Sequence, residues 1–132
     1  MSEPRETIDV VLVEDNDVFR NALGLLLGLT PDLRVVAAVA DGETALEVCP
    51  PLAPDVFVMD YRLPGRLDGV QATAAIREAC PSAAVVVLTA AAEADEVRAL
   101  HDAGAVACLT KDGDLDAIVT AIRDAGRPRV AR

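Results

Sequence analysis

The chain has 132 residues, which is the size of one domain built on a single hydrophobic core. Apolar residues make up 52% of it and charged residues 26%, a balance that excludes an intrinsically disordered chain. The formal net charge of −10 argues against direct binding to a nucleic acid backbone, and the scarcity of aromatic residues leaves no surface for stacking on bases.

Short runs of β-branched and aliphatic residues alternate with helical patterns about five times along the chain. The strands predicted from these runs are residues 8–13, 34–39, 55–59, 83–88 and 106–109. Several of them are apolar at every position, which is typical of parallel strands that are covered on both faces. Strands that alternate with helices imply right-handed crossovers, and therefore an α/β fold with a doubly wound parallel sheet.

The first predicted helix carries more apolar surface than one core contact needs. On a helical wheel, the apolar side chains of residues 18–29 cover an arc of about 200°, whereas core packing needs little more than about 100°. Two interpretations stay open. Either neighbouring helices cover the whole arc, or part of it borders a dimer or interdomain contact. The contact hypothesis fails if Leu27 is wholly buried in one protomer and Leu27→Glu leaves association unchanged.

Polar caps and prolines mark the ends of the next helices. Asp41 and Gly42 are predicted to open the second helix, which Pro50 and Pro51 would end, and Pro81 follows the third. The only histidine, at position 101, is interpreted as a surface residue of the fourth helix and not as a metal ligand.

The last helix has the clearest pattern. Asp112 is its predicted cap, and Asp114 and Asp116 lie in its first turn. Its apolar face consists of Leu115, Ile118, Val119 and Ile122. Residues 126–132 are basic, include a proline and lack periodicity. They are predicted to be a frayed end or the start of a linker after a domain of residues 1–125.

The three cysteines, Cys49, Cys80 and Cys108, are widely spaced, which favours reduced thiols over a disulfide framework or a zinc site. No apolar signal region opens the chain, and no segment approaches the roughly 20 apolar residues of a membrane span. These features predict a soluble, cytoplasmic protein without a membrane partner.

Polar residues follow four of the predicted strands: Glu14 and Asp15, Asp60, Thr89 and Lys111. In a doubly wound sheet, ligands collect at the carboxyl ends of the strands, near the point where the strand order reverses. Three carboxylates held close together repel one another, so the cluster should raise their proton affinity or recruit a hard cation such as Mg²⁺. A carboxylate beside the cation can attack phosphorus while an ammonium and a hydroxyl stabilise the developing charge, so this set predicts phosphoryl transfer to an aspartate.

Most of these residues also have an ordinary structural explanation. Glu14 and Asp15 are also explained as a polar strand exit, Thr89 as the cap of the following helix, and Lys111 as a solvated turn residue. Asp60 is harder to explain in this way, because it ends an apolar strand where an unpartnered carboxylate is costly. The occurrence of all four strand-end features together favours the functional interpretation.

Four sequence segments carry a family resemblance: VVLVEDND, PDVFVMDYRLPG followed by DG, VVVLTA, and GAVACLTKD. In this order and spacing, residues 8–125 resemble the receiver domain of two-component response regulators. The resemblance implies a flavodoxin-like sheet of five parallel strands in the order 2-1-3-4-5, with helices on both faces.

The resemblance also implies roles for individual residues. Asp60 would accept the phosphoryl group, Thr89 would bond a phosphoryl oxygen, and Lys111 would pair with the phosphate. Mg²⁺ would be held by Glu14, Asp15, Asp60 and the backbone carbonyl of Arg62. A histidine kinase, or sometimes acetyl phosphate, would be the donor, and the face formed by the fourth helix, fifth strand and fifth helix would respond.

The segment VEDNDVFRNAL and the pair Lys111–Asp112 resemble the NarL/LuxR branch, whose members carry a helix-turn-helix output domain. This implies control of transcription through a DNA-binding domain that is absent from this chain, and a homodimer is a further prediction. The chain departs from the family pattern at Cys108, where an aromatic side chain is usual, and we therefore predict a weaker structural response or a different relay. It departs also in the loop PGRLDG, which Arg66 and Leu67 lengthen.

Three alternative functions require other sequence features. A phosphohydrolase with an aspartyl nucleophile would have a second aspartate where Arg62 stands. A flavin or dinucleotide binder would show a glycine-rich G-x-G-x-x-G loop, which does not occur. A pseudo-receiver, which folds alike but only binds proteins, stays open because of Cys108 and the longer loop.

Overall fold

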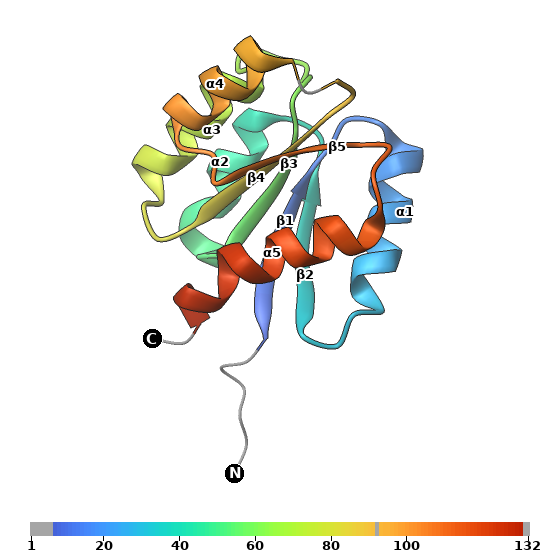
Figure 1. Cartoon of the computed structure of the whole chain (residues 1–132). Coiled ribbons are helices and arrows are strands. Elements are labelled where there is room, and N and C mark those ends of the chain that lie inside the picture. The colour runs from blue at the N-terminus through green and yellow to red at the C-terminus, as the bar shows by residue number, and fades with distance from the viewer. Residues whose placement is uncertain (1–6, 92, 131–132) are drawn as a thin grey trace.

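The computed structural model describes residues 7–91 and 93–130, and within these residues five strands alternate with five helices. All strands are parallel and form one sheet in the order β2-β1-β3-β4-β5, as predicted (Figure 1). The elements are β1 (Ile8–Val13), α1 (Asp17–Gly28), β2 (Leu33–Val39), α2 (Gly42–Leu52), β3 (Val56–Asp60), α3 (Gly69–Ala79), β4 (Ala84–Thr89), α4 (Ala94–Ala103), β5 (Ala107–Thr110) and α5 (Leu115–Val130).

The sheet separates two hydrophobic cores. Helices α1 and α5 cover one face, and α2, α3 and α4 cover the other (Figure 1). Alternate residues of β1 serve the two layers: Val10 and Leu12 pack with α1 and α5, whereas Val11 and Val13 pack with the opposite layer. The central strands are therefore apolar at every position because both of their faces are buried.

The predicted strand boundaries agree with the structure to within one residue. Strands β3, β4 and β5 each begin and end one residue later than predicted, so that Asp60 and Thr89 are the last residues of their strands. The ladder extends because the next backbone groups are also paired: the N–H of Tyr61 donates to Leu88 and that of Lys111 donates to Thr89, both at 2.8 Å. Asp60 and Thr89 are thus held by rigid strands and not by loops.

Helix α2 begins at the predicted cap, where the Asp41 side chain accepts a hydrogen bond from the N–H of Thr44. The prediction that Pro50 and Pro51 end the helix was wrong, because both lie inside its last turn. A proline ring fixes φ close to the helical value, so the chain continues to turn. The helix ends at Ala53, which has a left-handed conformation and donates its N–H to the carbonyl of Cys49.

Helix α5 differs from its prediction at both ends. The residue that precedes it is Asp114 and not Asp112: the Asp114 side chain accepts from the N–H of Asp116, at 3.1 Å. At the other end the helix continues through residues 126–130, where the sequence favoured a frayed end or a linker. Packing explains the extension, since Gly126 is buried and a Cβ there would lie 2.6 Å from Cγ2 of Ile8.

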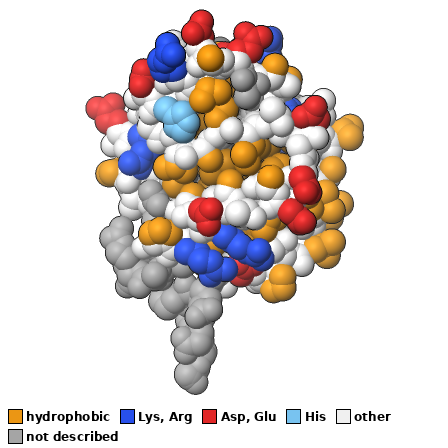
Figure 2. Space-filling view, in the orientation of Figure 1, with side chains coloured by type: hydrophobic (Ala, Val, Ile, Leu, Met, Phe, Trp, Pro, Cys, Tyr) orange, Lys and Arg blue, Asp and Glu red, His pale blue; other side chains and the backbone are white. Residues whose placement is uncertain are grey.

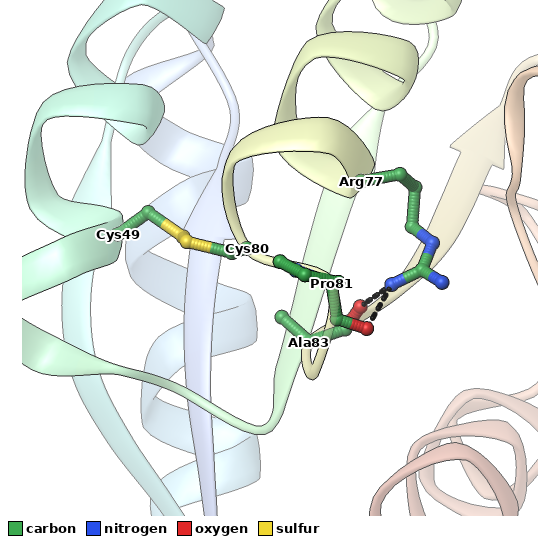
Figure 3. Close-up of a disulfide and its surroundings, with 5 residues drawn as sticks. All are labelled: Cys49, Arg77, Cys80, Pro81 and Ala83. Carbon is green, nitrogen blue, oxygen red and sulfur yellow. Dashed lines mark hydrogen bonds between the residues drawn. A yellow bond between two sulfur atoms is a disulfide. The ribbon is translucent and has the colours of Figure 1, made fainter.

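The prediction of reduced thiols was wrong for two of the three cysteines. Cys49 and Cys80 form a disulfide, with their Cα atoms 6.6 Å apart (Figure 3). It joins the last turn of α2 to the residue that follows α3, two helices that pack side by side on the same face of the sheet. The turn after Cys80 is held by Arg77, which donates to the carbonyls of Pro81 and Ala83. Cys108 is a free thiol.

Helix α1 buries only part of its apolar arc. Leu23 and Leu27 are buried in the protomer, so neighbouring elements account for one side of the helix. The other side is open, with Leu25 73% and Leu29 79% exposed, and hydrophobic side chains lie along the edge of the molecule that α1 occupies (Figure 2). The interpretation in which neighbours cover the whole arc is therefore wrong. The contact hypothesis stays a prediction, and Leu25 and Leu29 are better positions for its test than Leu27.

Across residues 7–91 and 93–130, no helix combines the length and the apolar character that a bilayer span requires.

Candidate functional site

The carboxyl edge of the sheet gathers polar side chains from four strands. Glu14 follows β1, Asp60 and Thr89 end β3 and β4, and Lys111 follows β5. The strand order reverses between β1 and β3, because β2 and β3 lie on opposite sides of β1 in the sheet. This reversal is the position at which open α/β sheets bind ligands.

Three carboxylates converge at this point. Carboxylate oxygens of Glu14, Asp15 and Asp60 all lie within 4.8 Å of one another. Glu14 and Asp60 are buried, with 4% and 7% of their surface exposed, while Asp15 is exposed at the mouth of the site. The backbone N–H of Asn16 donates to Oε2 of Glu14 at 3.0 Å and helps to hold that side chain inward. The cluster is therefore buried at Glu14 and Asp60 and open to solvent at Asp15.

Lys111 supplies the positive charge of the site. Its Nζ lies 2.8 Å from Oε1 of Glu14 and 3.5 Å from Oδ2 of Asp60. The ammonium also lies over the ring of Phe19, 4.4 Å from its centroid, a cation–π contact. Desolvation works to lower the pKa of Lys111, but the hydrogen bond to Glu14 and the charge of Asp60 outweigh it and raise the pKa. Lys111 is therefore a charged, partly buried member of the cluster and not a solvated turn residue.

Asp60 has the most perturbed electrostatics of this cluster. Burial and the nearby charge of Glu14 raise its pKa to about 6, although Lys111 and a hydrogen bond from the backbone N–H of Arg62 act in the opposite direction. One cation is thus too little to neutralise the buried carboxylates. A second cation at the open side would relieve this repulsion.

The donor set fits a hard divalent cation. Carboxylate oxygens are the ligands that Mg²⁺ prefers, and the open side next to Asp15 leaves room for water in its coordination shell. Glu14, Asp15 and Asp60 can therefore hold such an ion. The backbone carbonyl of Arg62, the fourth predicted ligand, stays a prediction.

Thr89 is buried beside the cluster, with 3% of its surface exposed. Its hydroxyl donates to the carbonyl of Ala91 at 3.1 Å. It does not cap the next helix, because the residue before α4 is Glu93. His101 also lies where the sequence suggested: it is an exposed residue of α4 whose Nδ1 is 3.0 Å from the carbonyl oxygen of Ala105.

An open pocket extends from the cluster over the loop that follows β3. Its lining comprises Asp15, Tyr61, Arg62, Leu63, Pro64, Asp68 and Glu96. Two side chains were not predicted from the sequence: Glu96, which comes from α4, and Phe19, which covers Lys111. Neither could be found by spacing along the chain, because each reaches the site through the packing of a helix against a distant strand end.

Comparison with known proteins agrees with this arrangement. Residues 10–123 match the response regulator receiver domain model. The transcriptional regulatory protein LiaR of Bacillus subtilis (strain 168) is 33% identical over 125 residues, covering 93% of this chain and 59% of LiaR. The transcriptional regulatory protein DegU of Brevibacillus brevis is 33% identical over 116 residues, covering 88% of this chain and 49% of DegU.

Among solved structures, the signal receiver domain of NarL from Mycobacterium tuberculosis superposes with a TM-score of 0.87 and 34% identity. That alignment covers 92% of this chain and 98% of the NarL domain. By contrast, the chain spans about half to three fifths of the length of the regulators LiaR and DegU. The chain therefore belongs to the response regulator receiver domain family, and its homologues are response regulators of the NarL/LuxR type.

Proposed function

We propose that this chain is the phosphoryl-accepting receiver of a two-component system, and that Asp60 takes the phosphoryl group from a histidine kinase. The observation that carries the proposal is the convergence of the buried Asp60 carboxylate with Glu14, Asp15 and Lys111 at the switch point of the sheet. A structural role alone does not account for three acidic side chains in one place, because their mutual repulsion is unfavourable.

In the proposed reaction, an oxygen of Asp60 attacks the phosphorus atom and the bond from phosphorus to the donor nitrogen breaks. The nucleophile must be ionised, and a pKa of about 6 leaves most Asp60 side chains deprotonated at neutral pH. Mg²⁺, held by Glu14, Asp15, Asp60 and the carbonyl of Arg62, would offset charge on the phosphoryl oxygens. Lys111, already 3.5 Å from Asp60, is placed to pair with the same oxygens.

The response would begin at Thr89 and Lys111. The hydroxyl of Thr89 now donates to Ala91, and bonding a phosphoryl oxygen would require it to give up that contact. Loss of that contact would release the segment before α4. The conformational equilibrium of the face formed by α4, β5 and α5 would then shift towards one of its arrangements. We expect a smaller shift than in receivers with an aromatic side chain at position 108, because the Cys108 thiol fills less volume.

The output we propose is control of transcription. LiaR and DegU are named as transcriptional regulators, and this chain corresponds to about half to three fifths of their length. The net charge of −10 makes the chain itself a poor DNA ligand, so DNA contact would fall to a domain outside it. A cytoplasmic location and a homodimer belong to the same proposal, as does the view that the only catalysis is of its own phosphorylation and dephosphorylation.

Incubation with acetyl phosphate and Mg²⁺, followed by intact mass measurement, tests the proposal. We expect a gain of one phosphoryl group that is absent in Asp60→Asn and is suppressed by a chelator. No gain by the wild-type protein would instead favour the pseudo-receiver, a protein-binding module without phosphorylation. That alternative draws its support from Cys108 at the usual aromatic position.

A further inference from the structure

The loop between β3 and α3, residues 61–68, runs directly from Asp60 and lines the pocket beside it. Its base is closed by a hydrogen bond from the N–H of Gly69 to the carbonyl of Tyr61, at 3.0 Å. The two ends of the loop lie so close together that a Cβ at position 69 would overlap the carbonyl oxygen of Tyr61. The loop thus returns tightly on itself, and its far end projects towards α2.

That far end is tied to the first turn of α2 by Glu43. The carboxylate oxygen Oε2 of Glu43 accepts a hydrogen bond from the backbone N–H of Arg66, at 2.6 Å. Gly65 approaches the same carboxylate so closely that a Cβ there would lie 2.8 Å and 2.9 Å from its two oxygens. Next to this contact, Leu67 packs against Gly42, where a Cβ would lie 3.3 Å from that of Leu67. Arg66 and Leu67 therefore attach the loop to α2.

The Glu43 carboxylate is held in this place at some cost. Its second oxygen, Oε1, is buried without a hydrogen-bond partner among the described residues. An orphaned buried acceptor is unfavourable. The N-terminus of α2, capped by Asp41, offsets part of the cost, since it favours negative charge in the first turn.

The loop links this carboxylate to Asp60. The loop begins directly after Asp60, and the backbone N–H of Arg62 acts to lower the pKa of the Asp60 carboxyl. We propose that Glu43 is a positioning residue of the phosphoryl site: by holding Arg66, it fixes the loop that orients Asp60 and carries the carbonyl of Arg62. The inference rests on the proposed function in so far as it concerns phosphorylation, but the tether itself can be tested separately.

Two substitutions separate the reach of the side chain from its charge. Glu43→Asp keeps the charge but shortens the side chain by one methylene, so that it no longer reaches the N–H of Arg66. Glu43→Gln loses the charge but keeps an acceptor at the right length. Glu47→Asp, one turn further along α2 at an exposed position, is the matched control.

Three readouts are needed. Amide exchange of Arg66 reports the tether directly. Magnesium affinity can be followed through the fluorescence of Tyr61, because it is the only tyrosine, it adjoins Asp60, and the chain has no tryptophan. The rate of phosphorylation by acetyl phosphate comes from intact mass.

We expect the amide of Arg66 to lose protection from exchange in Glu43→Asp. The same variant should bind Mg²⁺ about tenfold more weakly and accept the phosphoryl group about tenfold more slowly than the wild type. Glu43→Gln and Glu47→Asp should match the wild type in all three readouts. The inference is overturned if Glu43→Asp keeps wild-type affinity and rate, or if Glu43→Gln loses as much as Glu43→Asp. If the wild type takes no phosphoryl group, the proposed function fails, while amide exchange and magnesium affinity still decide the role of Glu43.

Discussion

Asp60→Asn should stabilise the metal-free protein, although it removes the residue on which the proposed function depends. In the absence of a cation, ionised Asp60 is buried beside Glu14 and only partly compensated by Lys111. Asparagine has nearly the same shape and no charge, so it keeps the packing and removes the repulsion. The prediction thus inverts the usual expectation for a substitution at a buried polar position.

The magnitude follows from the pKa of Asp60. Its rise from the ordinary value of 3.8 to about 6 means that ionised Asp60 costs the folded state about 3 kcal/mol. Between these pH values the folded protein keeps a proton that the unfolded chain has lost, so the free energy of unfolding falls as the pH rises. Asp60→Asn should therefore gain up to about 3 kcal/mol above pH 6 and little near pH 4. Water at the open side of the site, next to Asp15, screens the charge of Asp60, so this gain in the free energy of unfolding is an upper limit.

Urea unfolding with a chelator, at about pH 4.5 and about pH 7.5, measures this difference. Asp102→Asn, at an exposed position of α4, is the control and should stay within about 0.5 kcal/mol of the wild type. Added Mg²⁺ should stabilise the wild type and narrow its gap to Asp60→Asn, since a ligand stabilises the state that binds it. A variant that is less stable than the wild type at the higher pH, or a gain that does not depend on pH, would refute the reasoning.

Three further outcomes are expected. Arg123→Ala should lower the free energy of unfolding at neutral pH, because Arg123 pairs with Asp32 through two hydrogen bonds. The pair lowers the pKa of Asp32, so urea unfolding should show this loss vanish as the pH falls below 3.8. Gly126→Val should cost at least about 2 kcal/mol in thermal unfolding, since its side chain would collide with Ile8 in the core; unchanged stability would mean that residues 126–130 are not packed as described. Leu25→Glu should leave stability within about 0.5 kcal/mol but weaken self-association in sedimentation experiments, if the exposed side of α1 forms the predicted contact; equal association would reject that contact.

Most of the fold could be predicted because its strands carry a strong local signal. Buried parallel strands are apolar throughout, and polar helix caps such as Asp41 separate them from the helices. The error at Pro50 and Pro51 has a local cause, because the φ of proline is compatible with the last turn of α2. The other errors have tertiary causes. Residues 126–130 extend α5 because Gly126 packs on Ile8. The pairing of Cys49 with Cys80 likewise depends on how α2 lies against α3, which spacing in the sequence does not reveal.

The positions of the site residues were predictable for a topological reason. Glu14, Asp60, Thr89 and Lys111 all stand at the carboxyl ends of strands, and a parallel sheet brings these ends to one edge. Residues that reach the site from helices were not predictable. Phe19 covers Lys111 and Glu43 holds the loop after Asp60 only because α1 and α2 pack where they do.

Mapping the modified residue by peptide mass spectrometry, after incubation with acetyl phosphate and Mg²⁺, tests the central claim most directly. The account predicts one phosphoryl group, on the peptide that contains Asp60, and none when a chelator removes the cation. An unmodified Asp60 under conditions that keep the protein folded and loaded with Mg²⁺, or a phosphoryl group on another residue, would contradict it.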